Sequence, residues 1–352
     1  MADVLLEVRD VVKHYPVRRG VVVQRTVGSV QAVDGVSLAL RRGRTLGLVG
    51  ESGSGKSTLA RLLVGVEKPT AGQILLEGTD VTRMDRTARR ALRQKVQMIF
   101  QDPYTSLNPR MSVGEIVGEA FELHPASAPA GSRQAAVQEL LELVGLDPDH
   151  VHRYPHQFSG GQRQRIGIAR ALAVRPSVLV CDEPVSALDV SVQGQVINLL
   201  RRLQRELGLS YLFIAHDLAV VRHIAHEVSV MYLGRVVETG PRAGVYGSPR
   251  HPYTRALMSA VPLPDPTLRG RRDEIVLEGD VPSPSSPPSG CRFHTRCWWA
   301  GRQTADGSVP APCRGEDPRL TGDGDHLSAC HFPVAGPTGA GGAADGLRTV
   351  AR

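Results

Sequence analysis

Apolar residues gather in short runs along the first two thirds of the chain, and amphipathic stretches lie between them. Residues 4–12 and 36–49 are rich in Val and Leu and predict strands, the second ending in TLGLVG before a Gly/Ser loop and the apolar helix STLARLLVGV. Later strands are predicted at VQMIF, PSVLVCDEP and LSYLFIAHD, and the helical pattern VQGQVINLLRRLQRELG separates the last two. Strands that are apolar throughout and alternate with helices predict an α/β fold with a parallel sheet buried on both faces.

The remaining segments predict the domain organisation. Thr105–Leu146 is expected to be mostly helical with a break at HPASAPAGS, and SVMYLGRVVETG is expected to form a hairpin. From about residue 248 the composition shifts to Pro, Ser and Gly, and from Pro333 the segment PVAGPTGAGGAADG has too little apolar content to fold. We therefore expect a main domain over 1–247, a small loop-rich extension over 248–332 and a disordered tail over 333–352.

The composition indicates an ordinary soluble globular protein. The chain has 352 residues, 41% of them hydrophobic and 22% charged, and no apolar run approaches the roughly 18 residues of a membrane-spanning helix. The opening MADVLLEVRD has neither the basic nor the apolar region of a secretory signal, so a cytoplasmic chain is expected. The net charge of +7 comes mostly from arginines spread along the chain, without a basic block interleaved with aromatics, and therefore does not predict nucleic acid as a partner.

The segment GESGSGKST (Gly50–Thr58) fits the phosphate-binding pattern G-x-x-x-x-G-K-[ST], and it lies between a predicted strand and a predicted helix, as that pattern requires. Its glycines let backbone N–H groups and the helix N-terminus point at phosphate oxygens. Lys56 is one of only four lysines in an arginine-rich chain, and it is expected to place its charge on the β- and γ-phosphates. Ser57 is expected to offer its hydroxyl to Mg²⁺.

A second element of this chemistry is VLVCDEP (Val178–Pro184), an apolar strand that ends in Asp182 and Glu183. An acid at the carboxyl end of such a strand can hold Mg²⁺, and the next acid can orient or deprotonate an attacking water. Together the two patterns predict a nucleoside triphosphatase. Cys181, inside the strand, is expected to be a small core residue.

The segment FSGGQRQR (Phe158–Arg165) indicates which kind of triphosphatase this is. With it the chain resembles the ATP-binding subunits of ABC transporters, whose signature reads Leu-Ser-Gly-Gly-Gln; Phe158 stands where that signature has leucine. The resemblance covers about residues 4–332. It implies an ABC-type nucleotide-binding domain, with a RecA-like parallel-sheet core, an antiparallel β subdomain and a helical signature subdomain over about 104–165.

The resemblance also implies roles for single residues. Glu183 is expected to position the attacking water, His216 in IAHD to be the switch histidine near the γ-phosphate, and Gln101 in FQDP to touch the metal and sense the membrane domain. Tyr15, the one aromatic residue before Phe100, is the candidate to stack on adenine, with a packing role as the alternative. The implied Mg²⁺ set is Ser57, Gln101 and Asp182. The implied nucleotide-binding set is Tyr15, Gly50, Ser52, Gly53, Ser54, Gly55, Lys56, Ser57, Thr58, Ser159, Gly160, Gly161, Gln162 and Asp189.

Members of this family bind ATP between two ATPase subunits placed head to tail. The resemblance therefore implies that Ser159 and the amides of Gly160 and Gly161 complete the γ-phosphate site of the partner. ATP would hold the dimer together, and hydrolysis would release it. Closing and opening of the dimer would drive rearrangement of two membrane subunits.

The segment GSPRHPYTRALMSAVP (Gly247–Pro262) resembles the extension of oligopeptide, dipeptide and nickel importer ATPases. The opening KHYPVRRG, followed by the inserted stretch Val17–Val30, is similar to the second of the two ATPase subunits that such importers carry. The resemblance implies a peripheral protein at the cytoplasmic face of the cell membrane that couples ATP hydrolysis to uptake of di- or oligopeptides. Its implied partners are a second homologous ATPase subunit, two transmembrane permease subunits and an extracytoplasmic solute-binding protein. Import of nickel, glutathione or another small solute stays open, as does a soluble ABC ATPase outside transport.

Four of the five cysteines fall close together with the spacing C-x5-C-x15-C-x16-C: Cys291, Cys297, Cys313 and Cys330. Disulfides are disfavoured in a reducing compartment. Zinc is chemically possible, although no C-x2-4-C knuckle occurs, and an iron–sulfur cluster needs four thiolates gathered by the fold. Peptide-importer ATPases with this cysteine arrangement carry a [4Fe–4S] cluster, which the resemblance implies here. Zn²⁺ and no metal are the alternatives.

Overall fold

The computed structural model describes residues 3–19, 25–102, 104–261 and 274–336. The chain divides into two compact units, the first formed by residues 1–237 with 282–287 and the second by residues 238–281 with 288–352. Most of the tail expected to be disordered, 337–352, lies outside the described residues. No helix in the described ranges is long and apolar enough to cross a membrane.

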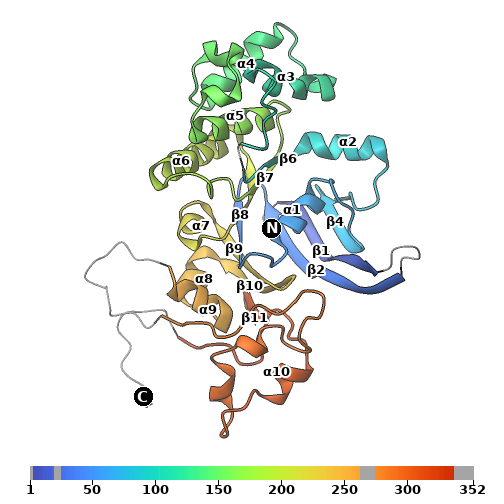
Figure 1. The fold of residues 1–352 in the computed structure, drawn as a ribbon, viewed down its shortest axis with the longest axis vertical. Coiled ribbons are helices and arrows are strands. Elements are labelled where there is room, and N and C mark those ends of the chain that lie inside the picture. The colour runs from blue at the N-terminus through green and yellow to red at the C-terminus, as the bar shows by residue number, and fades with distance from the viewer. Residues whose placement is uncertain (1–2, 20–24, 103, 262–273, 337–352) are drawn as a thin grey trace. The chain divides into compact units, whose positions relative to one another are not determined.

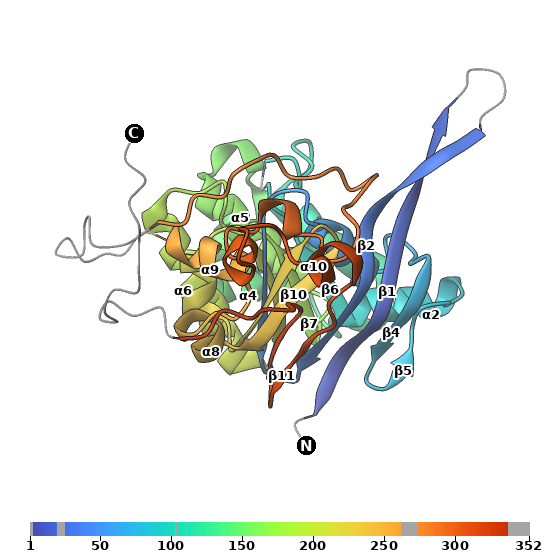
Figure 2. The ribbon, with the colours of Figure 1, turned by 90° about the horizontal axis from the view of Figure 1, so that it is seen from below.

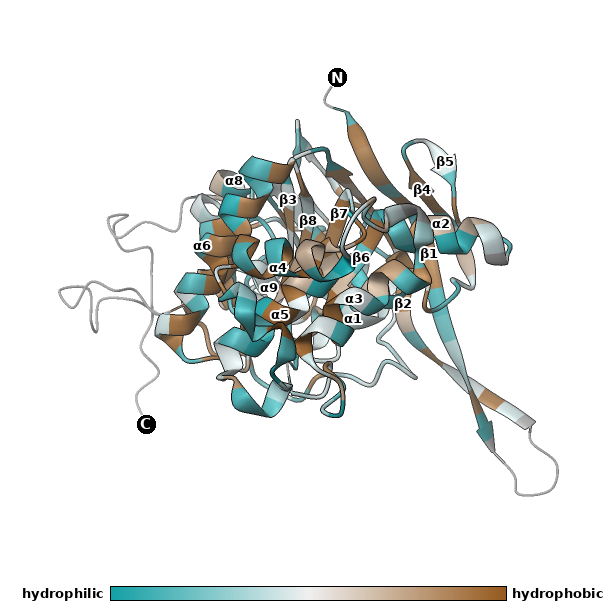
Figure 3. Cartoon of the chain, turned by 90° about the horizontal axis from the view of Figure 1, so that it is seen from above, coloured by the Kyte–Doolittle hydropathy of each residue, from teal (hydrophilic) through white to brown (hydrophobic). Residues whose placement is uncertain are grey.

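The first unit contains a parallel sheet (Figure 1) whose strands are largely apolar (Figure 3) and mostly buried. In spatial order the strands are β9 (Glu227–Tyr232), β3 (Thr45–Val49), β8 (Ser210–Ala215), β7 (Val178–Asp182) and β6 (Val96–Ile99). Every residue of β3, β7 and β8 is buried, as expected for strands covered on both faces. The sequence expectation of a single strand over 36–49 is corrected: a turn with Gly43 at φ +67° separates β3 from the preceding strand.

The helices of the first unit supply apolar faces to this core. They are α1 (Lys56–Leu63), α2 (Arg86–Lys95), α3 (Val113–Leu123), α4 (Arg133–Leu143), α5 (Gly160–Leu172), α6 (Val190–Leu207) and α7 (Leu218–Ile224). Short 3₁₀ turns over Pro125–Ser127, Pro148–His152 and Pro155–Gln157 connect α3, α4 and α5. Helix α3 begins at Val113 rather than at the expected Thr105, because Ser112 and Glu115 form a capping box that starts the helix there.

A separate antiparallel sheet contains, in spatial order, β2 (Arg25–Arg41), β1 (Val4–Arg19), β4 (Ala71–Leu76) and β5 (Thr79–Asp80). Beyond Val12, the last residue paired with β4, strand β1 pairs with β2 alone among the described residues, and the two strands extend as a ribbon past the rest of the sheet (Figure 2). The described residues of the inserted stretch Val17–Val30 therefore belong to strands β1 and β2, in which Val17 pairs with Gly28.

The second unit is rich in loops and short elements. It begins within β10 (Arg235–Pro241) and contains α8 (Arg242–Gly247), α9 (Pro252–Ser259), 3₁₀ turns over His294–Arg296 and Ala300–Gln303, α10 (Ala311–Gly315), β11 (Thr321–Asp323) and β12 (His326–Ser328). Strand β12 pairs with β10 through Glu238 opposite Ser328. Val334 is buried, and its N–H donates to the Arg250 carbonyl, so ordered packing extends beyond residue 332.

Candidate active site for ATP

Four adjacent parallel strands end at the same edge of the sheet, and each delivers a predicted site residue there. Strand β3 leads into the loop Gly50–Gly55, β7 ends at Asp182, β8 leads to His216 and β6 leads to Gln101. Because the strands are parallel, the side chains that follow them lie close together, in the position where open α/β sheets bind ligands. The sheet thus brings together residues that are distant in sequence.

The loop Gly50–Gly55, called the phosphate loop below, has a shape that only glycine permits at two positions. Gly55 has φ +104°, and a Cβ atom there would lie 2.0 Å from the Ala32 carbonyl oxygen. Gly50 has φ +152°, and a Cβ atom there would lie 2.1 Å from the Met231 carbonyl oxygen. Ser52 and Gly53 are exposed, whereas Ser54 is buried. The loop is therefore fixed by close backbone contacts while its tip stays accessible.

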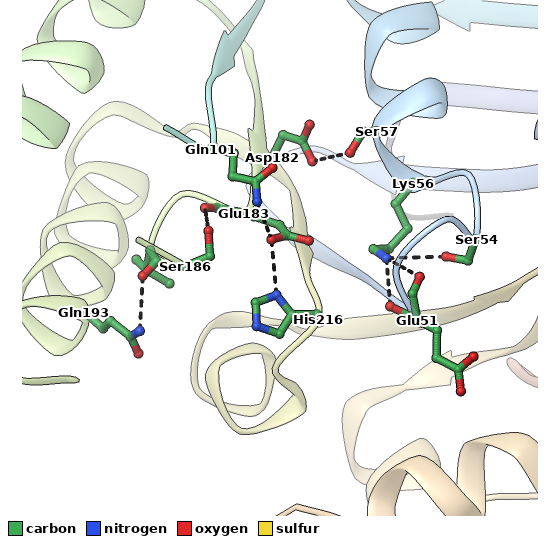
Figure 4. A network of polar contacts seen from close by, with 12 residues as sticks. Glu51, Ser54, Lys56, Ser57, Gln101, Asp182, Glu183, Ser186, Gln193 and His216 are labelled. Carbon is green, nitrogen blue, oxygen red and sulfur yellow. Dashed lines mark hydrogen bonds and ion pairs between the residues drawn. The ribbon is translucent and has the colours of Figure 1, made fainter. Parts of the chain in front are cut away.

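Lys56 is folded back over the phosphate loop. Its ammonium donates to the carbonyl oxygens of Gly50 at 2.7 Å and Glu51 at 2.8 Å, and lies 3.4 Å from the Ser54 hydroxyl oxygen (Figure 4). The residue is only 4% exposed, and this burial lowers its pKa, opposed by the nearby carboxylates of which Glu183 contributes most. Lys56 thus places a buried positive charge at the start of α1, whose N-terminus has no side-chain cap. This arrangement is suited to binding phosphate.

Two of the three side chains expected to hold Mg²⁺, Ser57 and Asp182, contact each other, whereas the third, Gln101, contacts Glu183. Ser57 donates its hydroxyl to Asp182 Oδ1 at 3.1 Å. Burial raises the pKa of Asp182, and the hydrogen bond from Ser57 opposes this shift. A hydroxyl and a carboxylate oxygen are ligands that Mg²⁺ prefers, so the donor set fits that ion.

Glu183 is the centre of a hydrogen-bonded group at this edge. Its Oε2 accepts from Gln101 Nε2 at 3.0 Å and lies 3.1 Å from His216 Nδ1 (Figure 4). Its backbone has φ +46°, a region that costs a non-glycine residue energy and is kept mainly at functional sites. The Ser186 hydroxyl donates to the Glu183 carbonyl oxygen at 3.0 Å. The structure therefore joins Gln101, Glu183 and His216, the residues expected to be catalytic.

The signature segment begins helix α5. Ser159 caps the helix and forms a capping box with Gln162, so Gly160 and Gly161 supply the amides of its first turn. A Cβ atom at Gly161 would lie 2.4 Å from Val192 Cγ1. Asp189 stands at the N-cap of α6 without a side-chain hydrogen bond to that helix. Among the described residues, the side chains of Ser159 and Gln162 form their hydrogen bonds within the capping box and not with the phosphate loop.

Tyr15 lies on β1 beside the end of the phosphate-loop helix. Its hydroxyl donates to Glu67, and burial, followed by this bond, raises the pKa of Tyr15 to about 12. A side-chain hydrogen bond with Thr58 acts in the opposite direction, which places the ring near the first turn of α1. The Lys13 ammonium lies 4.9 Å from the ring centroid. The Tyr15 hydroxyl therefore lies near the first turn of α1, and stacking of the Tyr15 ring on adenine stays a prediction.

Comparison with known proteins identifies the family. Residues 33–186 match the ABC transporter family, and residues 237–303 match the C-terminal region of oligopeptide/dipeptide transporters. The oligopeptide transport ATP-binding protein AppF of Bacillus subtilis is 53% identical over 296 residues, covering 84% of this chain and 89% of AppF. The dipeptide transport ATP-binding protein DppF of Escherichia coli is 50% identical over 326 residues, covering 93% of this chain and 93% of DppF. The chain belongs to the oligopeptide/dipeptide transport ATP-binding proteins.

Solved structures agree with this assignment. The ABC transporter component cbiO1 of Clostridium perfringens is 28% identical, with a TM-score of 0.60 over 69% of this chain and 91% of its own. A dimeric, post-hydrolysis ATP-binding cassette bound to ADP and Pi, MJ0796, is 27% identical, with a TM-score of 0.59 over 67% of this chain and 98% of its own. The expected fold class is therefore confirmed, and this transport ATP-binding protein is an ABC-type ATPase.

Sequence reasoning missed one contact that links two site segments of this transport ATP-binding protein. The Arg163 guanidinium lies 4.2 Å from the Tyr104 ring centroid, and the Tyr104 hydroxyl oxygen would lie 3.5 Å from a Cβ atom at Gly160. Tyr104 follows Gln101 in the loop after β6, whereas Arg163 is on the signature helix. The loop that carries Gln101 therefore packs directly on the signature. The aromatic residue three positions after Gln101 was the available signal.

The second unit of this transport ATP-binding protein brings the four clustered cysteines to one small cavity. Cys291, Cys297, Cys313 and Cys330 line it together with three histidines and apolar side chains that include Phe293 and Trp299. Burial is the largest cause of a raised pKa at each of the four thiols, to about 11 at Cys291 and about 12 at Cys330. Among the described residues, no three His, Cys, Asp or Glu side chains lie close enough together to hold a metal. Protonated thiols do not repel or attract as charges, so they pack here as small apolar groups.

Proposed function

We propose that this protein is the ATP-hydrolysing subunit of a membrane importer for di- or oligopeptides. The proposal rests mainly on one observation: the side chains of Gln101 and His216 both contact the Glu183 carboxylate. This group lies at the same sheet edge as the phosphate loop and the hydrogen-bonded pair of Ser57 and Asp182. The match of residues 237–303 to the C-terminal region of oligopeptide/dipeptide transporters supports a peptide as the cargo. The domain assignment proposed from sequence is an ATPase domain over 1–247, an extension over 248–332 and a tail over 333–352, whereas the second matched region already begins at residue 237.

The geometry supports a division of labour among the chain's own residues. Lys56 exchanges its carbonyl partners for β- and γ-phosphate oxygens, and the first amides of α1 bind the same phosphates. Ser57 and Asp182, with Gln101, hold Mg²⁺, whose charge offsets the phosphate charge when the ion is bound. Glu183 orients the attacking water and accepts its proton, while His216 lies on the γ-phosphate side. Tyr15 stacks on the adenine ring.

The test is the variant Glu183→Gln. Glutamine can still accept a hydrogen bond from Gln101 but is a far weaker base, so hydrolysis should fall by at least about 100-fold while ATP binding persists. Steady-state ATPase assays and nucleotide binding by fluorescence measure the two effects separately. Glu227→Gln is the matched control, because Glu227 pairs with Arg41 away from the phosphate loop. Turnover near the wild-type rate in Glu183→Gln would remove Glu183 from catalysis.

We further propose that the functional unit is a head-to-tail pair with a second, homologous ATPase subunit. Ser159, Gly160, Gly161 and Gln162 then complete the γ-phosphate site of that partner, with Ser159 exposed at the N-cap of α5. The long β1–β2 ribbon supports the assignment of this chain as the second ATPase subunit of such importers. Sedimentation of Glu183→Gln with and without ATP, alone and mixed with the second ATPase, tests the pairing. If neither the variant alone nor its mixture with the second ATPase associates when ATP is added, the proposed pairing is contradicted.

The remaining partners are two permease subunits and an extracytoplasmic solute-binding protein, with this chain peripheral on the cytoplasmic face of the membrane. Co-purification with the permeases tests the assembly, because a soluble ABC ATPase would not sediment with membranes. Uptake of a labelled tripeptide in cells carrying wild type or Glu183→Gln tests the cargo. Competition by nickel or glutathione instead of peptides would reassign the cargo without changing the ATPase.

We propose, finally, that the four cysteines hold a metal centre, a [4Fe–4S] cluster or alternatively zinc. The support is that four thiols from a stretch of forty residues line a single cavity with apolar walls. Because no three possible ligands among the described residues lie close enough together to hold an ion, binding would require these side chains to draw together. Such thiols become thiolates when a metal binds, and a set of four cysteines fits either centre. Iron, sulfide and zinc analysis after anaerobic purification decides between them. A chain with none of these elements would refute the centre.

A further inference from the structure

One face of helix α5 carries two arginines that contact the loop after β6, called the glutamine loop below and taken as the described residues of 100–106. The Arg163 guanidinium lies 4.2 Å from the Tyr104 ring centroid, and Arg170 donates from Nη1 to the Ser106 carbonyl oxygen at 2.7 Å. About two helical turns separate the two arginines, so they lie on the same face of α5. The helix that begins with the signature is therefore joined to the glutamine loop at two points.

Asp102 fixes the position of Tyr104 relative to Gln101 in this loop. Asp102 Oδ1 accepts from the Tyr104 N–H at 2.8 Å, and Asp102 Oδ2 accepts from the Thr105 hydroxyl at 2.9 Å. An aspartate that accepts from the backbone N–H two residues later closes an Asx turn, which makes the loop compact here. Because Gln101 directly precedes this turn, we expect Gln101 and the Tyr104 ring to move together.

Arg163 also binds the segment that leads into the signature. Its Nε donates to the carbonyl oxygens of Pro155 at 2.8 Å and Phe158 at 3.1 Å. Phe158 immediately precedes Ser159, the N-cap of α5. An arginine can bind carbonyls and an aromatic ring together, because its N–H donors lie in the guanidinium plane and leave the face free to stack. One side chain thus contacts both the Tyr104 ring and the backbone that sets the position of Ser159.

Gly160, the first residue of α5, lies between two loops of the ATP site. A Cβ atom there would lie 3.5 Å from the Tyr104 hydroxyl oxygen and 3.3 Å from Leu188 Cδ2. Tyr104 belongs to the glutamine loop, and Leu188 belongs to the loop that follows Glu183. Because the approach to Leu188 is already tight, a larger residue at this position would have to displace the Leu188 side chain. The start of the signature is thus packed against both loops.

From these contacts we propose that Arg163 and Tyr104 couple the ATP site of this chain to its signature. Gln101 belongs to the ATP site, where it donates to Glu183 at 3.0 Å, and Ser159 begins the signature. Arg163 and Tyr104 are positioning residues, because they act through Gln101 and Ser159 rather than on the nucleotide. The inference rests on the proposed function, in which the signature serves the γ-phosphate of the partner subunit. Occupation of one ATP site therefore changes the segment that serves the other, and the reverse effect is equally large.

Hydrogen exchange at the signature distinguishes coupling from a purely structural role. The backbone N–H groups of Ser159 and Gln162 donate within the capping box, so their exchange rates measure how often the start of α5 opens. A contact that only stabilises the fold changes these rates equally with and without nucleotide. A contact that couples the two segments changes how strongly these rates respond to nucleotide.

The test uses the full-length chain in five forms: wild type, Tyr104→Leu, Tyr104→Phe, Arg163→Gln and Arg165→Gln. Leucine removes the aromatic face that Arg163 contacts, whereas phenylalanine keeps it. Tyr104 is 56% exposed, so neither change leaves a cavity in the core. Arg165→Gln is the matched control, because Arg165 is on the same helix and donates to the carbonyl oxygens of Val144 and Gly145, outside the glutamine loop. Circular dichroism confirms that each variant is folded.

Exchange is measured with and without a non-hydrolysable ATP analogue and Mg²⁺, at a dilution at which sedimentation detects only the monomer. In wild type, Tyr104→Phe and Arg165→Gln, the analogue should change exchange at the two amides by about fivefold, the lower end of typical coupling. In Tyr104→Leu and Arg163→Gln the change should fall below about twofold, because the contact between arginine and ring is lost. Fluorescence titration should still show analogue binding to both variants.

A full response to the analogue in either Tyr104→Leu or Arg163→Gln overturns the proposed coupling. So does an equal loss of response in the control Arg165→Gln, or a wild type that binds the analogue without any change at the two amides. Each of these results leaves the proposed ATPase function in place. A wild type that neither binds the analogue nor hydrolyses ATP with the second ATPase contradicts the proposed function as well.

Discussion

Replacing Glu238 by glutamine tests how the second unit is held together. Three donors face the two oxygens of this fully buried side chain: the N–H groups of Arg250 and His251, and the ring of His326. Glutamine has nearly the same volume, but it turns one acceptor oxygen into an NH₂ group that faces one of these donors. A hydrogen bond to a charged group contributes about 1.5–3 kcal/mol, so losing one should destabilise the local structure by about 2 kcal/mol.

The assay is hydrogen exchange of the backbone amides of Arg250 and His251. A loss of about 2 kcal/mol corresponds to roughly 30-fold faster exchange if these amides open locally. Glu238→Leu leaves all three donors without an acceptor and should have a larger effect, of about 3–9 kcal/mol, enough to unfold the second unit. Glu7→Gln, which alters an exposed pair with Arg9, is the control and should leave exchange at both amides unchanged. Unchanged exchange in Glu238→Gln would show that the buried carboxylate does not hold this segment.

Further predictions concern the nucleotide site. Tyr15→Ala should weaken ATP binding about tenfold, whereas Tyr15→Phe, which keeps the ring, should bind nearly as wild type in fluorescence titrations; equal affinities would leave the ring a packing residue. Because burial lowers the pKa of Lys56 and phosphate favours its charged form, ATP binding should take up protons at alkaline pH between the free and bound pKa values. Calorimetry in buffers of different ionisation enthalpy measures this uptake, and its absence as the pH rises would contradict the account. Gly55→Ala, whose Cβ would lie 2.0 Å from the Ala32 carbonyl oxygen, should lose phosphate binding and at least about 2 kcal/mol of stability. Gly53 also has a positive φ, +78°, but open space around its Cβ, so Gly53→Ala should cost only the roughly 1–2 kcal/mol of a left-handed backbone and keep phosphate binding; equal loss of binding in both variants would argue against steric closure of the loop.

The catalytic edge was predictable from sequence because each of its motifs follows an apolar strand. The carboxyl ends of parallel strands meet at one edge of a sheet. Because Gln101, Asp182, Glu183 and His216 each stand at or just after the carboxyl end of a predicted strand, the sequence alone places them together. The hydrogen bonds from Gln101 and His216 to one oxygen of Glu183 were not predictable, because they depend on loop geometry and on a left-handed backbone at Glu183.

Other features depend on contacts between distant parts of the chain. The extension of β1 and β2 rests on cross-strand pairs such as Tyr15 with Val30, whereas the local sequence reads as an insertion. Glu238 lies in the predicted hairpin SVMYLGRVVETG, and its contact with His326, 88 residues later, depends on the fold and not on local sequence. The cysteine spacing indicated a shared site, yet only the fold shows which histidines and apolar side chains line the same cavity.

The position of Lys56 has a consequence for ligand discrimination. Its ammonium is already solvated by two carbonyl oxygens of its own loop, so an incoming ligand must compete with these internal acceptors. The β- and γ-phosphates of ATP offer several negatively charged oxygens, and we expect these to replace the two carbonyl oxygens as partners of the Lys56 ammonium. Adenosine or a nucleoside monophosphate bound near Tyr15 would not reach the ammonium, so the carbonyl contacts would remain. We therefore expect the phosphate loop to discriminate among nucleotides by the length and charge of their phosphate groups.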